Sequence, residues 1–142
     1  MIILDTNVLS EPMRAESNPA VAEWLDRQAT DTLYLTTVTL AELLLGVELM
    51  PLGVRRSKLE ARIAAVVNTF GEQRTLGFDT RAARLFAVMI ARARGAGRTI
   101  GVADGQIAAI AAAHGFVVAT RETAPFIAAG VPVIDPWEVG GR

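Results

Sequence analysis

Short runs of apolar residues alternate along this chain with longer segments whose apolar positions recur every three or four residues. The first run, residues 2–4, passes directly into Asp5, Thr6 and Asn7 before apolar residues resume. A short continuous apolar run is typical of a strand that is covered on both faces, as in a parallel sheet. Similar runs predict the remaining strands at residues 33–35, 75–78, 116–119 and 131–134.

The segments between these runs have the spacing of amphipathic helices. Asn18 and Pro19 predict one helix start, and Gly115 predicts a helix end. Further helices are predicted at residues 40–50, 55–70, 80–94 and 102–114, and a short helix is predicted at 122–129. Alternating strands and helices predict a three-layer α/β domain with a central parallel five-stranded sheet flanked by helices. No linker or repeat interrupts the pattern, so residues 1–142 are expected to form a single domain.

Composition limits the chemistry that this domain could perform. The net charge is −1, so nucleic-acid contact would need local basic clusters rather than a generally basic surface. The absence of cysteine and the single histidine argue against thiolate and histidine-rich metal sites. We find no signal-peptide pattern, and the apolar segment 105–119 is too short for a membrane span. A cytoplasmic protein with no membrane partner is therefore expected.

Four carboxylates fall at corresponding places in the alternation. Asp5 follows the first strand, and Glu42 lies in the first turn of the helix after the second. Asp104 opens a helix within an apolar run, and Glu122 follows the fourth strand. The carboxyl ends of parallel strands meet at one edge of a sheet, where these acids would converge. Clustered carboxylates repel one another, and Mg²⁺ or Mn²⁺ would remove that repulsion with the oxygen ligands it prefers.

Each acid also has a purely structural interpretation. Asp5 could cap the helix that follows it. Thr39 and Glu42 match the spacing of a capping box. Asp104 could complement the helix dipole, and Glu122 could be a solvated acid of a first helical turn. Taken singly, each acid fits either interpretation; their joint placement favours a common site.

At these positions the chain resembles PIN-domain nucleases, and among them the VapC- and FitB-like toxins of bacterial toxin–antitoxin pairs. The resemblance covers nearly the whole sequence, and its motifs occur in the family's order. The motifs are ILDTNVLS at residues 3–10, TLAEL at 39–43 followed by Gly46, ADGQIAA at 103–109, and VATRET at 118–123 with VIDPW at 133–137.

The closing motif departs from the commoner form of the family. Glu122 stands where that form has asparagine, and Pro125 stands where it has aspartate. The FitB-like group instead places its fourth acid at the position of Glu122.

The resemblance implies a Mg²⁺- or Mn²⁺-dependent endoribonuclease that acts as a toxin. By this resemblance Asp5 and Asp104 are metal ligands, Glu42 binds the metal directly or through water, and Glu122 is the fourth acid. It also implies a cognate antitoxin, an RNA substrate and a homodimer, with operator DNA bound only through the antitoxin.

Neighbouring polar residues are expected to position the substrate. Thr6, Asn7 and Thr120 are candidates to orient a water or a phosphate oxygen, and Arg121 is a candidate phosphate clamp. Basic residues also cluster at 55–62 and 81–98. These clusters are either solvated helix faces or contacts to an RNA backbone.

Three other functions compete with the nuclease interpretation. A haloacid-dehalogenase-type phosphatase needs a second aspartate where Asn7 stands. A phospho-receiver domain needs a lysine after a late strand, but Lys58 is the only lysine and lies mid-chain. A non-catalytic module that forms a DNA-binding repressor complex with its antitoxin stays open, because the closing motif is altered.

Overall fold

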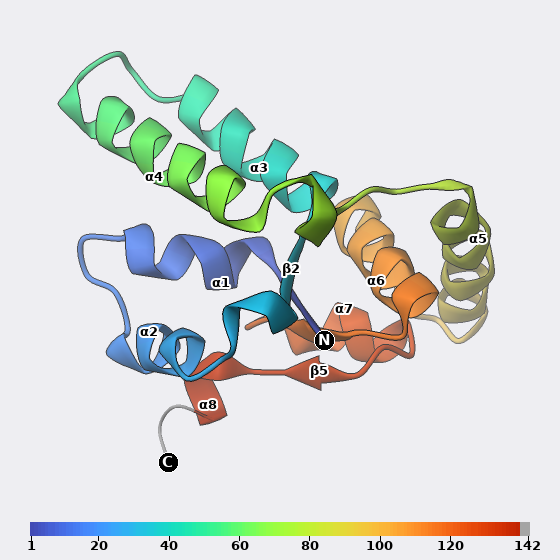
Figure 1. Ribbon diagram of the computed structural model, residues 1–142. Coiled ribbons are helices and arrows are strands. Elements are labelled where there is room, and N and C mark those ends of the chain that lie inside the picture. Colours follow the sequence, from blue (N-terminus) through green and yellow to red (C-terminus); the bar gives the residue numbers. More distant parts are fainter. Residues whose placement is uncertain (140–142) are drawn as a thin grey trace.

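Five short strands form one parallel sheet at the centre of the molecule (Figure 1). The structure is a computed structural model and describes residues 1–139. The sheet order is β3-β2-β1-β4-β5, with β1 in the middle. The strands are β1 (Ile2–Leu4), β2 (Leu33–Thr36), β3 (Thr75–Leu76), β4 (Val117–Ala119) and β5 (Val133–Ile134).

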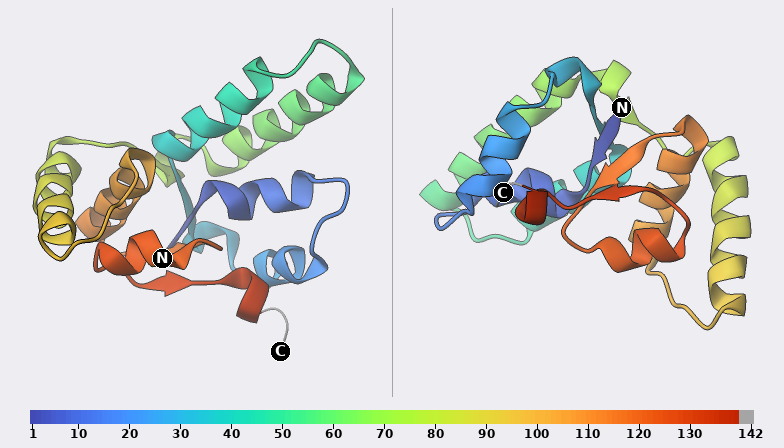
Figure 2. Two further views of the ribbon diagram at one scale, coloured as in Figure 1. Left: turned by 180° about the vertical axis from the view of Figure 1, so that it is seen from behind. Right: turned by 90° about the horizontal axis from the view of Figure 1, so that it is seen from below.

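Helices cover both faces of this sheet, so the predicted three-layer α/β architecture is confirmed (Figures 1 and 2). Ile3 and Val118 are in register and pack into one apolar cluster, whereas Leu4 and Ala119 pack into the other. The first cluster is covered by α5 (Thr80–Gly95), α6 (Val102–His114) and α7 (Thr123–Ala128). The second is covered mainly by α1 (Thr6–Ser10), α2 (Pro19–Asp26), α3 (Thr37–Glu48) and α4 (Val54–Phe70). The short helix α8 (Pro136–Val139) packs on α2.

Helices α3 and α4 form an antiparallel pair that extends away from the sheet (Figure 1). Its surface exposes several large apolar side chains, which are Leu44, Leu45, Leu49, Leu52 and Val54. No helix in residues 1–139 has both the length and the apolar character needed to cross a membrane.

The start of α3 differs from the prediction. The helix begins at Thr37 rather than Leu40, because Thr36 at the end of β2 takes the N-cap position and accepts a hydrogen bond from the Thr39 amide at 3.1 Å. Glu42 therefore lies in the second helical turn, not the first. The capping-box interpretation of Thr39 and Glu42 is wrong, since Thr39 is already inside the helix.

Most other helix boundaries agree with the sequence signals. Asn18 caps α2 by accepting from the Ala20 amide, with Pro19 as the first helical residue. The helix predicted at residues 102–114 is α6, and Gly115 ends it in the left-handed conformation, with φ of 68°. The edge strands β3 and β5 are shorter than predicted, with two residues each.

Gly105 in α6 marks a close approach between α5 and α6. A Cβ atom at this position would lie 2.9 Å from both Ile90 Cδ1 and Phe86 Cε2 of α5. These separations are shorter than van der Waals contact, so only glycine fits without movement of α5 side chains. The absence of a side chain here sets how closely the two helices pack.

Replacement of Gly105 by valine is expected to lower the free energy of unfolding by about 1–3 kcal/mol, because the new side chain would overpack this contact. Gly46→Ala is the matched control, since no atom lies within 4 Å of a Cβ atom built there. Alanine at a helical position favours folding over glycine by about 0.5–1 kcal/mol. Urea unfolding followed by circular dichroism measures both changes, and equal midpoints would contradict the close contact.

Candidate functional site

The four predicted acids are placed by elements whose ends meet at one edge of the sheet. Asp5 follows β1, and Glu122 follows β4, the neighbour of β1. Glu42 lies in α3, which starts directly after β2 on the other side of β1. Asp104 comes from the first turn of α6, which packs beside α3. Parallel pairing of the three strands therefore brings distant parts of the sequence to the same place.

Asp5 is the most buried of these acids, with 5% of its surface exposed. One carboxylate oxygen accepts a hydrogen bond from the Thr6 amide at 2.8 Å, and the other accepts from the Thr120 hydroxyl at 2.8 Å. Burial raises the pKa of Asp5 to about 6; the two hydrogen bonds lower it, and the charges of Asp104 and Glu42 raise it. Asp5 is also the N-cap of α1, so its interpretation as a helix cap is confirmed, while its role as a metal ligand stays a prediction.

Hydrogen bonds connect Asp5 to most of the other predicted site residues. The Thr6 hydroxyl donates to Glu42 Oε1 at 2.9 Å. The Asn7 side-chain amide donates to Thr120 Oγ1 at 3.4 Å, and Asn7 Oδ1 accepts from the Arg121 backbone amide at 3.2 Å. Through these bonds the first motif of the sequence is attached directly to the closing motif, 113 residues further along.

Asp104 joins the group through charge rather than through a hydrogen bond. Partial burial raises the pKa of Asp104, and the nearby carboxylates of Glu122 and Glu42 raise it further. Its place in the first turn of α6 also agrees with the helix-dipole interpretation. The charge of Glu42 therefore acts on both aspartates, and the charge of Glu122 acts on Asp104.

The two glutamates are exposed, unlike Asp5. Glu122 lies one residue before α7 as its N-cap, so the interpretation as a first-turn acid is wrong by one position; its side chain makes no capping hydrogen bond. Its backbone amide donates to Thr120 Oγ1 at 3.1 Å, which fixes the chain next to Asp5.

The site offers the donor chemistry of a hard divalent cation, but not a closed set of ligands. Carboxylate and hydroxyl oxygens are the groups that Mg²⁺ and Mn²⁺ prefer. Within residues 1–139, however, no three or more Asp, Glu or His side chains are arranged to hold a metal ion as they stand. The exposed side chains of Glu42 and Glu122 would have to turn toward Asp5 and Asp104 to complete such a set.

The side chain of Arg121 packs on an aromatic ring. Its guanidinium carbon lies 5.2 Å from the centroid of the Trp137 ring, within the range of a cation–π contact. The backbone of Arg121 is fixed by Asn7, as described above. Trp137 packs at the edge of the core, and Trp24 is buried inside it, so neither ring is a free platform for stacking bases.

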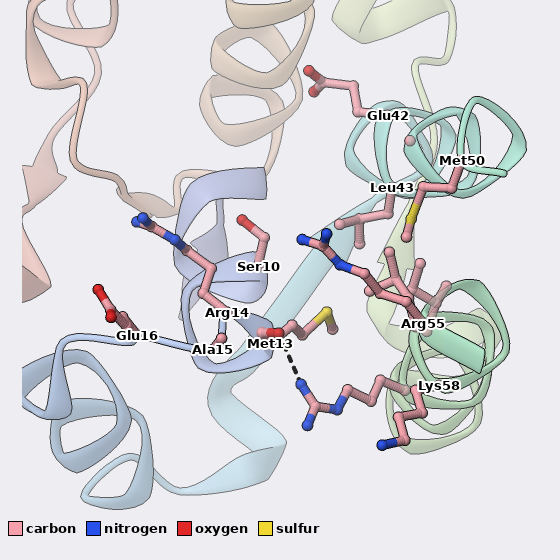
Figure 3. Close-up of a pocket in the computed structure, with 14 residues that line it drawn as sticks. Ser10, Met13, Arg14, Ala15, Glu16, Glu42, Leu43, Met50, Arg55 and Lys58 are labelled. Atoms are coloured by element: carbon pink, nitrogen blue, oxygen red, sulfur yellow. Dashed lines mark hydrogen bonds between the residues drawn. The ribbon is translucent and has the colours of Figure 1, made fainter. Parts of the chain in front are cut away.

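A cleft of about 970 Å³ opens beside Glu42, between α1 with the short helix η1 (Glu11–Met13) on one side and α3–α4 on the other (Figure 3). We call it the α1–α4 cleft. Its basic lining residues are Arg14, Arg55, Lys58 and Arg62, and its acidic ones are Glu16 and Glu42. The basic cluster of α4 was predicted from the sequence, whereas Ser10 and Arg14 were not, because no local signal in the sequence marks them as cleft residues.

Comparison with known proteins agrees with this architecture. The PIN domain family model matches residues 2–130. The chain is 50% identical over 138 residues to the VapC ribonuclease Y4jK of Sinorhizobium fredii, covering 97% of this chain and 99% of that protein.

Two solved structures have nearly the same fold. The crystal structure of FitAcB from Neisseria gonorrhoeae is similar with a TM-score of 0.92 at 43% identity, covering 96% of this chain and 99% of that chain. A structure of FitAB bound to an IR36 DNA fragment gives a TM-score of 0.91 at 42% identity, covering 96% of both chains. With a family model that spans most of its length and relatives similar along their whole length, the chain belongs to the PIN-domain family.

Proposed function

We propose that this protein is a metal-dependent endoribonuclease that acts as the toxin of a toxin–antitoxin pair. The observation that supports the proposal is that Asp5, Glu42, Asp104 and Glu122 follow or adjoin strand ends at one sheet edge, where burial and neighbouring carboxylates raise the pKa of both aspartates. The similarity to a relative named VapC ribonuclease supports the same reaction class. The cytoplasm is the proposed site of action, because RNA substrates are available there.

Mg²⁺ or Mn²⁺ fits the chemistry of these side chains. In the proposal Asp5 and Asp104 bind the ion directly, Glu42 binds it directly or through water, and Glu122 provides the fourth acid. When bound, such an ion supplies a water of lowered pKa and stabilises negative charge on a phosphate under attack. Neutralising the mutual repulsion of the carboxylates would favour the inward turn of the two exposed glutamates.

In the proposal the neighbouring polar residues orient the Asp5 carboxylate and a phosphate of the substrate. Thr6 and Thr120 hold the two carboxylate oxygens of Asp5 with the short hydrogen bonds described above, and Asn7 fixes Thr120. Arg121 is the proposed phosphate clamp: its guanidinium stacks on Trp137 and forms no ion pair in the described part of the chain. Guanidinium groups suit this task because their N–H groups match phosphate oxygens.

The proposed partners are a cognate antitoxin, an RNA substrate and a second copy of this chain, with operator DNA reached only through the antitoxin. The similar FitAcB and DNA-bound FitAB structures support the first and last of these. The exposed leucines of the α3–α4 pair offer apolar area for protein contacts.

A second candidate is a binding module without nuclease activity, which would form a DNA-binding repressor complex with the antitoxin. The observation that favours it is the lack of a ready-made metal-holding group within residues 1–139. The altered closing motif, with Glu122 in place of asparagine, points the same way.

Purified protein is expected to cleave an RNA pool in the presence of Mn²⁺ or Mg²⁺ and to lose this activity in EDTA. Asp5→Asn should lower the cleavage rate by about 100-fold or more, since changing even the groups that support a metal ligand costs about 10–100-fold. Asp31→Asn is the matched control, because Asp31 is exposed and lies just before β2, away from the carboxyl edge of the sheet. Gel analysis of labelled RNA measures the rates.

Equal cleavage by the wild type, with and without EDTA, and by Asp5→Asn would reject the metal mechanism. No cleavage by the wild type, together with operator binding in the presence of the antitoxin, would favour the repressor module.

The raised pKa of Asp5 should make the metal-free protein less stable as pH rises. The folded state keeps the Asp5 proton up to about pH 6, whereas the unfolded chain releases it near 3.8. Relative to Asp5→Asn, the free energy of unfolding of the wild type should therefore fall by up to about 3 kcal/mol between about pH 4 and pH 7. Urea unfolding of both proteins across this range measures the difference, and a constant difference would contradict the burial of an ionisable Asp5.

Adding Mg²⁺ at neutral pH should raise the Tm of the wild type, because a ligand that binds only the folded state stabilises it. Asp31→Asn should respond like the wild type, and Asp5→Asn should not respond. A Tm rise of the same size in all three proteins would rule out an ion site that includes Asp5.

A further inference from the structure

The α1–α4 cleft has a positive lining in a protein whose net charge is −1. Four of its lining side chains are basic and two are acidic. Figure 3 shows the guanidinium of Arg55 pointing from α4 into the space beside α1, with Lys58 further along the same helix. Glu42, one of the four acids, is among its lining residues, so the cleft adjoins the candidate site.

The basic side chains of the cleft differ in how far they are already engaged. Arg14 pairs with Glu11 at 3.2 Å, and Arg62 donates to the Met13 carbonyl at 2.8 Å. Arg55 and Lys58 are exposed and form no ion pair or side-chain hydrogen bond among residues 1–139.

Arg56, between them in sequence, serves as a contrast. Its guanidinium is bound to Glu60 at 2.8 Å, to Glu48 at 3.3 Å and to the Met50 carbonyl at 3.1 Å. Arg56 therefore stabilises the α3–α4 pair, while its two neighbours keep their charge available for a ligand.

The spacing of the available charges suits a polymer of phosphates. Residues 55, 58 and 62 recur at three and four positions along α4, which places them on one side of the helix over about 10 Å. Successive nucleotides of a stacked strand rise by about 3.4 Å, so this side of the helix spans about three of them. The remaining lining is largely aliphatic and contains no aromatic ring on which a base could stack.

We propose that Arg55 and Lys58 bind the phosphate backbone of a single-stranded RNA that lies in the α1–α4 cleft, next to the bond that is cut. The inference rests on the proposed nuclease function and assigns its substrate-binding surface. A carboxylate cluster repels a polyanion, and positive side chains beside Glu42 offset that repulsion where the strand enters. Because the contacts are to phosphate, this part of the cleft should accept different base sequences.

The test uses binding of a short, fluorescently labelled single-stranded RNA of mixed sequence to the Asp5→Asn protein in EDTA, where no cleavage occurs. Adding Arg55→Ala and Lys58→Ala should raise the Kd by about 10-fold or more. It should also reduce the slope of log affinity against log salt concentration by about 1.4, since each phosphate contact to a single strand contributes about 0.7. The charge-preserving pair Arg55→Lys and Lys58→Arg should retain most of the affinity.

Arg81→Ala with Arg84→Ala is the matched control. These arginines have the same spacing and are also exposed, but they lie on α5, on the opposite side of the sheet (Figure 1). The control pair should leave the Kd and the salt slope unchanged. Equal weakening by both pairs, or weakening by neither, would overturn the proposal.

The nuclease function is tested separately by cleavage with the wild type. RNA binding that depends on Arg55 and Lys58 without any cleavage would reject the nuclease function and retain the binding surface. Cleavage by the wild type, with RNA binding unchanged by Arg55→Ala and Lys58→Ala, would retain the nuclease function and reject the binding surface. Unchanged RNA binding combined with weaker antitoxin binding would assign the cleft to a protein partner and overturn the proposal.

Discussion

The burial of one carboxylate, that of Asp5, is the constraint on which the geometry of the site depends. A charged group inside a protein needs partners in place of water, and Asp5 finds them in the Thr6 amide and the Thr120 hydroxyl. Thr120 comes from the end of β4, and the Thr6 hydroxyl in turn holds Glu42 of α3. The hydrogen bonds around this carboxylate therefore hold together the ends of β1 and β4 and the start of α3, which are distant in sequence.

Much of this arrangement could be predicted because each buried strand is an apolar run that ends at a polar residue. An apolar run that stops at Asp5, and another that stops at Thr120, identify the two residues that face each other across β1 and β4. Because β1 and β4 are parallel neighbours, their ends lie side by side at the same edge of the sheet. The boundaries of α6 were equally clear, because Gly115 is suited to the left-handed conformation that ends a helix.

The features that could not be predicted depend on contacts between distant segments. Thr36 takes the cap of α3 because β2 ends there, and the local spacing of Thr39 and Glu42 mimicked a capping box. The two sides of the α1–α4 cleft are joined by the hydrogen bond from Arg62 of α4 to the Met13 carbonyl of η1, 49 positions away in the chain. Likewise, buried Glu11 holds the Asn18 amide at 2.9 Å and so fixes the loop before α2, and nothing in the local pattern distinguishes it from a surface acid.

The missing side chain at position 105 links the packing of the domain to the chemistry of its acids. Gly105 determines how near α6 sits to α5, and the residue before it is Asp104. A larger residue at position 105 would press on Phe86 and Ile90 of α5 from the same turn of α6 that carries this carboxylate. The residue at position 105 therefore affects both the stability of the fold and the position of Asp104. A change that improves helix packing here is also constrained by the placement of that acid.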